Sequence, residues 1–175
     1  MIGPDADELE RGAKFVLKLG FESEHPGVIE DPLGVVRWRY ETQPRRSAYS
    51  LANLFRKPDF VLGSPEGHEV FRIRRVSRHP PTFAMQGKGL VLATLVRRSI
   101  LRNKYVLQFK EGQAWTFRMP LFTSSFWGES APGRRLWVQV GPSTMQWYVL
   151  FQPGGESVEL LGGLVFIHRD WLCYS

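Results

Sequence analysis

An almost uninterrupted apolar run close to the C-terminus constrains the fold most, because a segment of this kind has to be enclosed. The run follows a Pro-Gly-Gly break at residues 153–155 and extends from Val158 to Trp171. Apolar residues occupy nearly its whole circumference when it is drawn as a helix, which is typical of a helix surrounded by protein. We therefore predict a buried hydrophobic helix near residues 156–170.

The ends of this run favour a helix, although a strand stays an alternative for part of it. Hydrogen-bond acceptors at residues 156–157 suit a helix start, and basic residues at 168–169 suit a helix end. The glycine pair at 162–163 disfavours a helix by about 1 kcal/mol per glycine, and residues 164–167 would also form a central strand. About 12 helical residues span roughly 18 Å, too little for a hydrocarbon core of about 30 Å. We expect no transmembrane span.

The composition favours one domain inside the cell. A chain of 175 residues with 43% hydrophobic residues is long enough for a single hydrophobic core. Cys173 is the only cysteine, which excludes an intramolecular disulfide and favours a reducing compartment. Residues 1–14 are polar and lack the order of a secretory signal. We expect a polar lead over residues 1–14, one domain over residues 15–175 and a cytoplasmic location.

Short alternating segments precede the apolar run. Residues 15–21 predict a strand, residues 22–32 a loop and residues 33–40 a second strand, in which aromatic and apolar residues alternate with Arg37 and Arg39. Residues 49–55 fit either a helix or a strand.

Four hairpin-like units then follow one another, each with two short strands about a glycine-containing turn. Their strands are expected at residues 60–62 and 69–73, 83–85 and 90–96, 105–109 and 114–119, and 136–140 and 147–151. Near-even spacing of such units predicts a closed antiparallel barrel or a sandwich.

The barrel is the better of these two alternatives. Residues 90–96 are apolar on both faces, so we expect the helix to cover one face and the N-terminal segment the other. Six Trp, five Tyr and 12 Phe exceed what a barrel filled by its own side chains needs. The sequence therefore predicts a mainly β protein, with a large closed antiparallel barrel around the C-terminal helix.

These hairpins, at residues 59–73, 83–93 and 105–109 and closed by the apolar helix, resemble the tubby-like superfamily, in particular its LURP-one-related and phospholipid-scramblase branches. The resemblance covers roughly residues 33–172. It implies about twelve strands around a central helix. It further implies a protein without enzymatic activity that binds phosphoinositide or other anionic phospholipid head groups, or a partner protein. The cysteine-rich and calcium-binding features of scramblases have no counterpart here, so calcium-driven lipid transport is not expected.

A group of basic residues supplies the candidate anion-binding site on a chain of net charge +6. Arginine forks bind phosphate oxygens in pairs. The group comprises Arg72, Arg74, Arg75, Arg78, Arg97, Arg98, Arg102 and Lys104. The alternative is a solvated outer face, on which these cations pair with carboxylates such as Glu69 and Glu111.

The connection expected over residues 120–135 supplies a candidate membrane-contact loop. Its aromatic rings could enter a membrane interface while its arginines meet lipid phosphates. The residues concerned are Phe122, Phe126, Trp127, Arg134 and Arg135. The alternative is that the aromatic rings fold back and seal the mouth of the barrel.

Catalytic motifs are missing from the sequence. None of the four histidines has a metal-ligand or nucleophile–base spacing, and no phosphate-binding glycine loop occurs. We expect no enzyme, no metal and no cofactor. A basic β-protein could instead bind nucleic acid, but most aromatic residues share strand parity with the aliphatic core rather than with the cations. A scaffold module without a small ligand is the remaining alternative.

Overall fold

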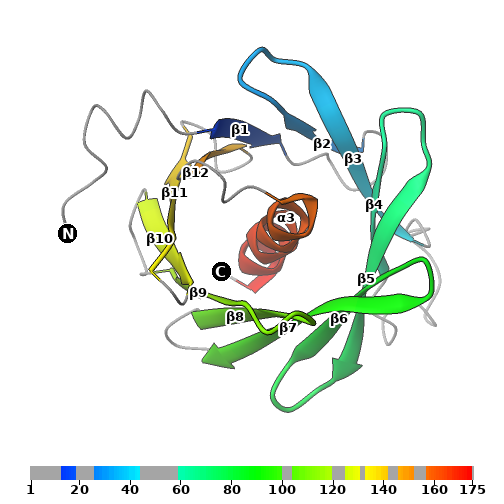
Figure 1. Cartoon of the computed structure of the whole chain (residues 1–175), viewed down its shortest axis with the longest axis vertical. Helices are drawn as coiled ribbons and strands as arrows, with labels where there is room; N and C mark the ends of the chain where they lie inside the picture. Colours follow the sequence, from blue (N-terminus) through cyan, green and yellow to red (C-terminus); the bar gives the residue numbers. More distant parts are fainter. Residues whose placement is uncertain are drawn as a thin grey trace.

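The structure is a computed structural model that describes residues 13–18, 26–43, 59–99, 104–119, 125–130, 133–141, 146–151 and 157–174. Within these residues, twelve strands form one closed antiparallel barrel, and helix α3 (Val158–Tyr174) runs through its centre (Figure 1). The strands follow one another around the barrel in chain order, and β1 pairs with β12 to close it. The prediction of a closed antiparallel barrel around a buried C-terminal helix is confirmed.

The strands have the following bounds. The first six are β1 (Ala13–Lys18), β2 (Gly27–Glu30), β3 (Val36–Gln43), β4 (Asp59–Gly63), β5 (Glu69–Ser77) and β6 (Thr82–Gly87). The other six are β7 (Leu90–Ser99), β8 (Lys104–Phe109), β9 (Ala114–Arg118), β10 (Ser125–Ser130), β11 (Arg135–Val140) and β12 (Gln146–Phe151). Each of the four predicted hairpins corresponds to one pair, namely β4–β5, β6–β7, β8–β9 and β11–β12.

Two strands lie where the sequence predicts irregular chain. Strand β2 falls inside the expected loop 22–32, and its fully buried Ile29 pairs with Trp38. Strand β10 falls inside the expected connection 120–135. Gly128 weakens the apolar alternation that would indicate a strand. It also allows the wall to pack closely, since a Cβ there would stand 2.6 Å from the Phe117 ring. Residues 44–58, which include the ambiguous segment 49–55, lie outside the described residues.

The helix is packed against the inner wall over most of its length. Leu164, Val165 and Ile167 are completely buried. The glycine pair has a steric reason, because a Cβ on Gly162 would overlap the Phe71 ring and one on Gly163 would stand 2.8 Å from Leu107. The barrel wall therefore approaches the helix where the two glycines lie.

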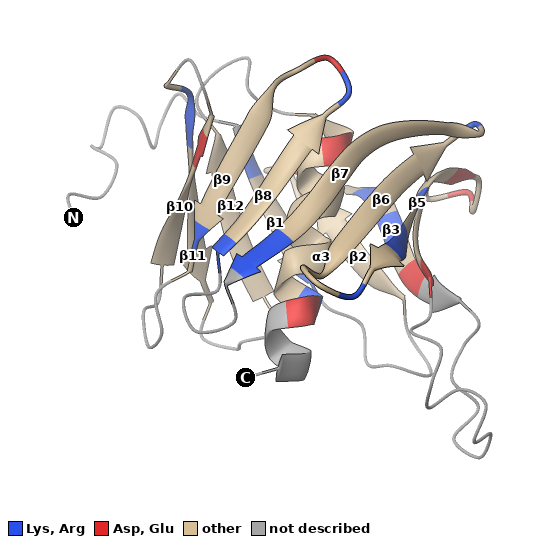
Figure 2. Ribbon diagram, turned by 90° about the horizontal axis from the view of Figure 1, so that it is seen from below, with Lys and Arg blue, Asp and Glu red and all other residues tan. Residues whose placement is uncertain are grey.

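The two open ends of the barrel differ and are named here after the ends of α3. The N-mouth is the end at which α3 begins, with the turns at residues 31–35, 64–68, 88–89 and 110–113. The C-mouth is the end at which α3 finishes, with the turn at residues 78–81. Lys, Arg, Asp and Glu lie mainly on turns and strand ends (Figure 2).

The outer wall follows the alternation expected for half-buried strands. On β3, Arg37 and Arg39 are exposed whereas Tyr40 is buried. On β7, Leu90 is 58% exposed and Val91 44% exposed, so the start of this strand lacks the second apolar cover expected for it. The N-terminal segment was expected to supply that cover, and residues 1–12 lie outside the described part of the chain.

Candidate functional site

The eight basic residues predicted to bind anions do not form one surface. Arg72 contacts two carboxylates, Glu69 at 2.6 Å and Asp59 at 3.3 Å, and Arg74 contacts Asp59 at 2.7 Å. The hydrogen bond from Arg72 lowers the pKa of Glu69. These two arginines are therefore neutralised by their neighbours on the outer wall, as the solvated-face alternative predicted for Glu69.

Arg97 lies inside the barrel, which corrects its assignment to an outer basic face. It shares the inward parity of Leu95, is 8% exposed and contacts the Asp170 carboxylate of α3 at 3.3 Å. Tyr105 on β8 donates its hydroxyl proton to the same carboxylate oxygen at 2.9 Å. We call these three residues, Arg97, Tyr105 and Asp170, the buried lock. The buried lock connects strands β7 and β8 to the C-terminal part of α3.

The electrostatics of the buried lock are consistent with this role. Burial raises the pKa of Tyr105, and the Asp170 carboxylate raises it further. The phenol therefore keeps its proton and acts as a donor. A further buried polar residue, His168, lies two residues before Asp170 on α3. It is fully buried and stacks on Trp147 at a centroid distance of 3.9 Å.

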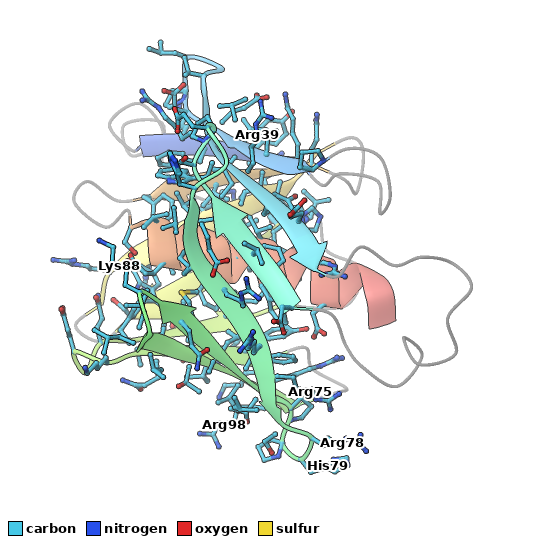
Figure 3. The ribbon with its side chains drawn as sticks, turned by 90° about the vertical axis from the view of Figure 1, so that its right-hand side faces the viewer. Arg39, Arg75, Arg78, His79, Lys88 and Arg98 are labelled. Carbon is cyan, nitrogen blue, oxygen red and sulfur yellow. The ribbon has the colours of Figure 1, made fainter. Side chains whose placement is uncertain are left out.

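The remaining cations gather at one corner of the C-mouth. Arg75, Arg78 and Arg98 lie close together in Figure 3, whereas Arg39 and Lys88 lie away from them. The Arg97 backbone N–H donates to Pro81 at 2.9 Å and so holds the end of β7 against the turn at 78–81. Arg75 donates to the carbonyls of Ser77 and Arg78 and thereby stiffens this turn.

A cross-strand row extends this corner around the outer wall. Lys104 on β8 is the register partner of Arg118 on β9, and Arg118 is the partner of Trp127 on β10. Trp127 in turn pairs with Trp137 on β11, with ring centroids 4.3 Å apart at 66°. All four share the outward parity of their strands. Arg118 was not predicted, although its alternation with the buried Trp115 and Phe117 could have placed it outside.

We call Arg78, Arg98, Lys104 and Arg118 the basic rim, and Trp127 with Trp137 the tryptophan pair. No described carboxylate forms an ion pair with any member of the basic rim. Neighbouring strands are about 4.8 Å apart, so the row from Lys104 to Trp137 covers about 14 Å of the wall. Several positive charges without an ion-pair partner among the described residues favour an anionic ligand.

The predicted membrane-contact loop is divided between three places. Phe126 is 3% exposed and packs edge-on against Trp147 at 5.1 Å, so it belongs to the core rather than to a membrane contact. Phe126 is an inward-facing residue of the wall strand β10, which differs from both a membrane-contact loop and a loop that folds back over the barrel mouth. Trp127 lies on the outer wall, and Arg134 and Arg135 lie beside the N-mouth, away from the basic rim. Phe122, like Arg102, lies outside the described residues.

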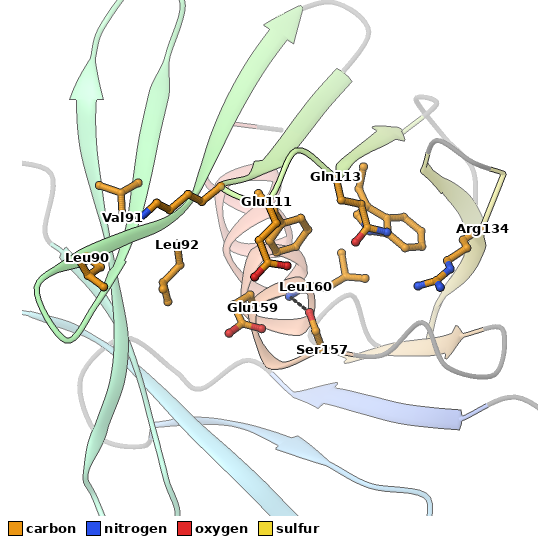
Figure 4. A pocket seen from close by; sticks show the side chains of 12 residues that line it. Leu90, Val91, Leu92, Glu111, Gln113, Arg134, Ser157, Glu159 and Leu160 are labelled. Carbon is orange, nitrogen blue, oxygen red and sulfur yellow. Dashed lines mark hydrogen bonds between the residues drawn. The ribbon is translucent and has the colours of Figure 1, made fainter.

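A pocket of about 330 Å³ opens at the N-mouth beside the start of α3 (Figure 4). Apolar side chains from β7, β8, β9 and α3 line it together with four charged residues from the adjoining turns and the helix. The lining comprises Leu90, Val91, Leu92, Phe109, Lys110, Glu111, Gln113, Trp115, Arg134, Ser157, Glu159 and Leu160. Glu111, expected as a partner of the basic group, belongs to this pocket instead.

The described residues contain no group of three or more His, Cys, Asp or Glu side chains that could hold a metal ion. None of the helical residues described forms a stretch both long and apolar enough to cross a bilayer. Comparisons of the chain with protein-family models, curated proteins and solved structures found no match, so the resemblance to the tubby-like superfamily stays a prediction.

Proposed function

We propose that this protein binds anionic phospholipid head groups at a membrane surface, without enzymatic activity. One observation carries the proposal: the cations Lys104 and Arg118, which have no described acidic partner, run directly into the outward-facing pair Trp127 and Trp137. Cations next to indole rings match the two layers of a membrane surface, which are the phosphates and the boundary of the acyl chains.

Each cation of the basic rim contributes a moderate binding free energy, and these contributions add up. A Lys or Arg near an anionic leaflet contributes about 1 kcal/mol, so the four cations of the basic rim supply roughly 4 kcal/mol. The guanidinium groups of Arg78, Arg98 and Arg118 can each also donate two hydrogen bonds to a phosphate group. The tryptophan pair adds apolar contact that salt does not screen.

The test is flotation of the full chain with phosphatidylcholine vesicles, alone or with added phosphatidylserine or phosphoinositide. We expect binding to the anionic vesicles only. The double variant Arg98→Ala/Arg118→Ala should reduce the partition coefficient about 25-fold, at roughly fivefold per cation. Arg39→Ala, an exposed arginine on β3 away from the rim, is the matched control and should have no such effect. Equal binding to neutral and anionic vesicles would refute the proposal.

Binding of single-stranded nucleic acid is a second candidate, favoured by the direct pairing of Arg118 with Trp127. Bases usually stack within a basic groove, whereas this row lies on the outer wall of a closed barrel. A competition assay between anionic vesicles and a single-stranded oligonucleotide, repeated with the variant Trp127→Thr, distinguishes the candidates. If the oligonucleotide binds more tightly than the vesicles do, and loses affinity in Trp127→Thr, the membrane proposal is wrong.

A further inference from the structure

The pocket at the N-mouth is a preformed hollow that the proposed membrane surface does not use. At about 330 Å³ it falls at the lower end of the range of about 300–1,000 Å³ that is usual for small-molecule sites. The turn at residues 110–113 forms one side of the pocket beside β7, because the Lys110 N–H donates to the Leu92 carbonyl at 3.0 Å and so continues the pairing of β8 with β7. Gly112, at a φ of +92°, allows the chain to reverse there into β9.

The floor and one edge of the pocket are apolar. Leu160 and Trp115, which are 1% and 2% exposed, lie at its base. Leu90 and Val91 form an edge that is open to solvent, and Leu92 lies beside them (Figure 4). An aliphatic or aromatic group bound there would bury the exposed edge without displacing any protein side chain.

Two carboxylates point into the same space. Glu111 comes from the turn after β8 and Glu159 from the first turn of α3, and both are directed into the pocket in Figure 4. Among the described residues neither glutamate forms an ion pair. The lining also holds two cations, Lys110 and Arg134, and Arg134 lies across the pocket from Glu111 and Glu159 in Figure 4. The part of the pocket next to the start of α3 therefore presents two carboxylates beside an apolar floor.

The start of the helix does not make this an anion site. The Ser157 hydroxyl accepts the Leu160 N–H at 3.1 Å, and the Ser157 carbonyl accepts the Leu161 N–H at 3.0 Å. The partial positive charge of the helix end already meets the Glu159 carboxylate in the first turn. An anionic ligand approaching the free N–H groups would meet that carboxylate and be repelled.

We propose that this pocket binds a small apolar amine, that is, an ammonium group on an aromatic or short aliphatic body. The ammonium donates hydrogen bonds to Glu111 and Glu159, and the body lies on Leu160 and against Trp115. Carboxylates and an aromatic ring together are the usual means of recognising an ammonium ion. This site is independent of the basic rim, which lies at the opposite mouth.

Three probes with a common aromatic body test the charge preference: phenethylamine, phenethyl alcohol and phenylacetate, each titrated into the full chain by calorimetry and ligand-observed NMR. We expect phenethylamine to bind, the neutral alcohol to bind about tenfold more weakly, and phenylacetate to show no saturable binding. Tighter binding of phenylacetate than of the amine would overturn the proposal, and so would the absence of binding by all three probes.

Variants locate the binding within the pocket. Glu111→Gln and Glu159→Gln should each weaken phenethylamine about tenfold and leave phenethyl alcohol unchanged. Val91→Trp, at an exposed edge position that does not disturb the core, should block both probes. Glu66→Gln, on the exposed turn between β4 and β5, is the matched control. Unchanged amine binding in both glutamine variants, or in Val91→Trp, would refute the assignment.

Discussion

The two mouths of the barrel hold the two ends of α3 in different ways. At the C-mouth, charged groups are buried: Arg97 and Asp170 form an ion pair inside the barrel, and the cations of the basic rim lie outside it. At the N-mouth, the turns are short, Ser157 caps the helix and the carboxylates line an open pocket. The comparison indicates that the C-mouth fixes the position of the helix, whereas the N-mouth leaves space for a ligand.

Removing the carboxylate of the buried lock should have the largest effect. Asp170→Ala removes a buried carboxylate that accepts from both Arg97 and Tyr105, and should lower the free energy of unfolding by about 3–5 kcal/mol. Asp59→Ala, which removes an ion-pair partner of Arg72 and Arg74 on the outer wall, should cost about 1 kcal/mol or less. Urea denaturation measures both changes. Equal losses in the two variants would mean that the lock does not hold the C-mouth.

A methyl group on the helix should be the next most damaging change. Gly162→Ala gains about 1 kcal/mol of helix propensity, but its Cβ would overlap the fully buried Phe71 ring. Overpacking usually costs about 1–3 kcal/mol, and a full overlap with a buried ring belongs at the upper end, so we expect a net loss of about 2 kcal/mol by thermal denaturation. Gly163→Ala meets the end of a flexible leucine side chain at 2.8 Å and should cost less. A stabilised Gly162→Ala variant would contradict the close approach of wall and helix.

The helix cap tests the N-mouth. Ser157→Ala removes the acceptor of the Leu160 N–H and should cost about 1 kcal/mol. Hydrogen exchange should then increase at the first turn of α3, while amides near Asp170 keep their protection. Loss of protection at both ends would show that the mouths are not independent. Ser157→Asp, which preserves an acceptor, is the control.

The smallest effect concerns pH at the turn between β2 and β3. The pKa of Asp31 is lowered by hydrogen bonds from the backbone N–H groups of Val35 and Leu33 and by the Arg37 guanidinium, although burial opposes the shift. Because its pKa is lowered, Asp31 stabilises the folded state fully at pH values above the ordinary pKa of an aspartate. This contribution disappears as the pH falls through the lowered pKa of the folded state. Asp31→Asn should therefore flatten the acid limb of a stability–pH curve. An unchanged limb would refute the prediction.

Local patterns predicted much of the wall but little of the site. The hairpins were predictable because apolar alternation and glycine turns coincide, as in β8 and β9. Strand β10 was missed because Gly128 and flanking polar residues weaken its alternation. The basic group was overestimated because a run of arginines gives no information on which carboxylates the neighbouring strand supplies, such as Asp59 opposite the arginines of β5.

An antiparallel β-architecture that encloses a hydrophobic C-terminal helix was predictable from the sequence, because both features depend on short-range periodicity and on the need to bury a continuous apolar run. Which cations remain available for a ligand depends on the folded barrel. Closure of the barrel sends Arg97 inward to Asp170 and brings Arg118 beside Trp127, although 73 residues separate the first pair. Register between strands depends on the whole closed sheet, so contacts of this kind are not encoded in any single segment.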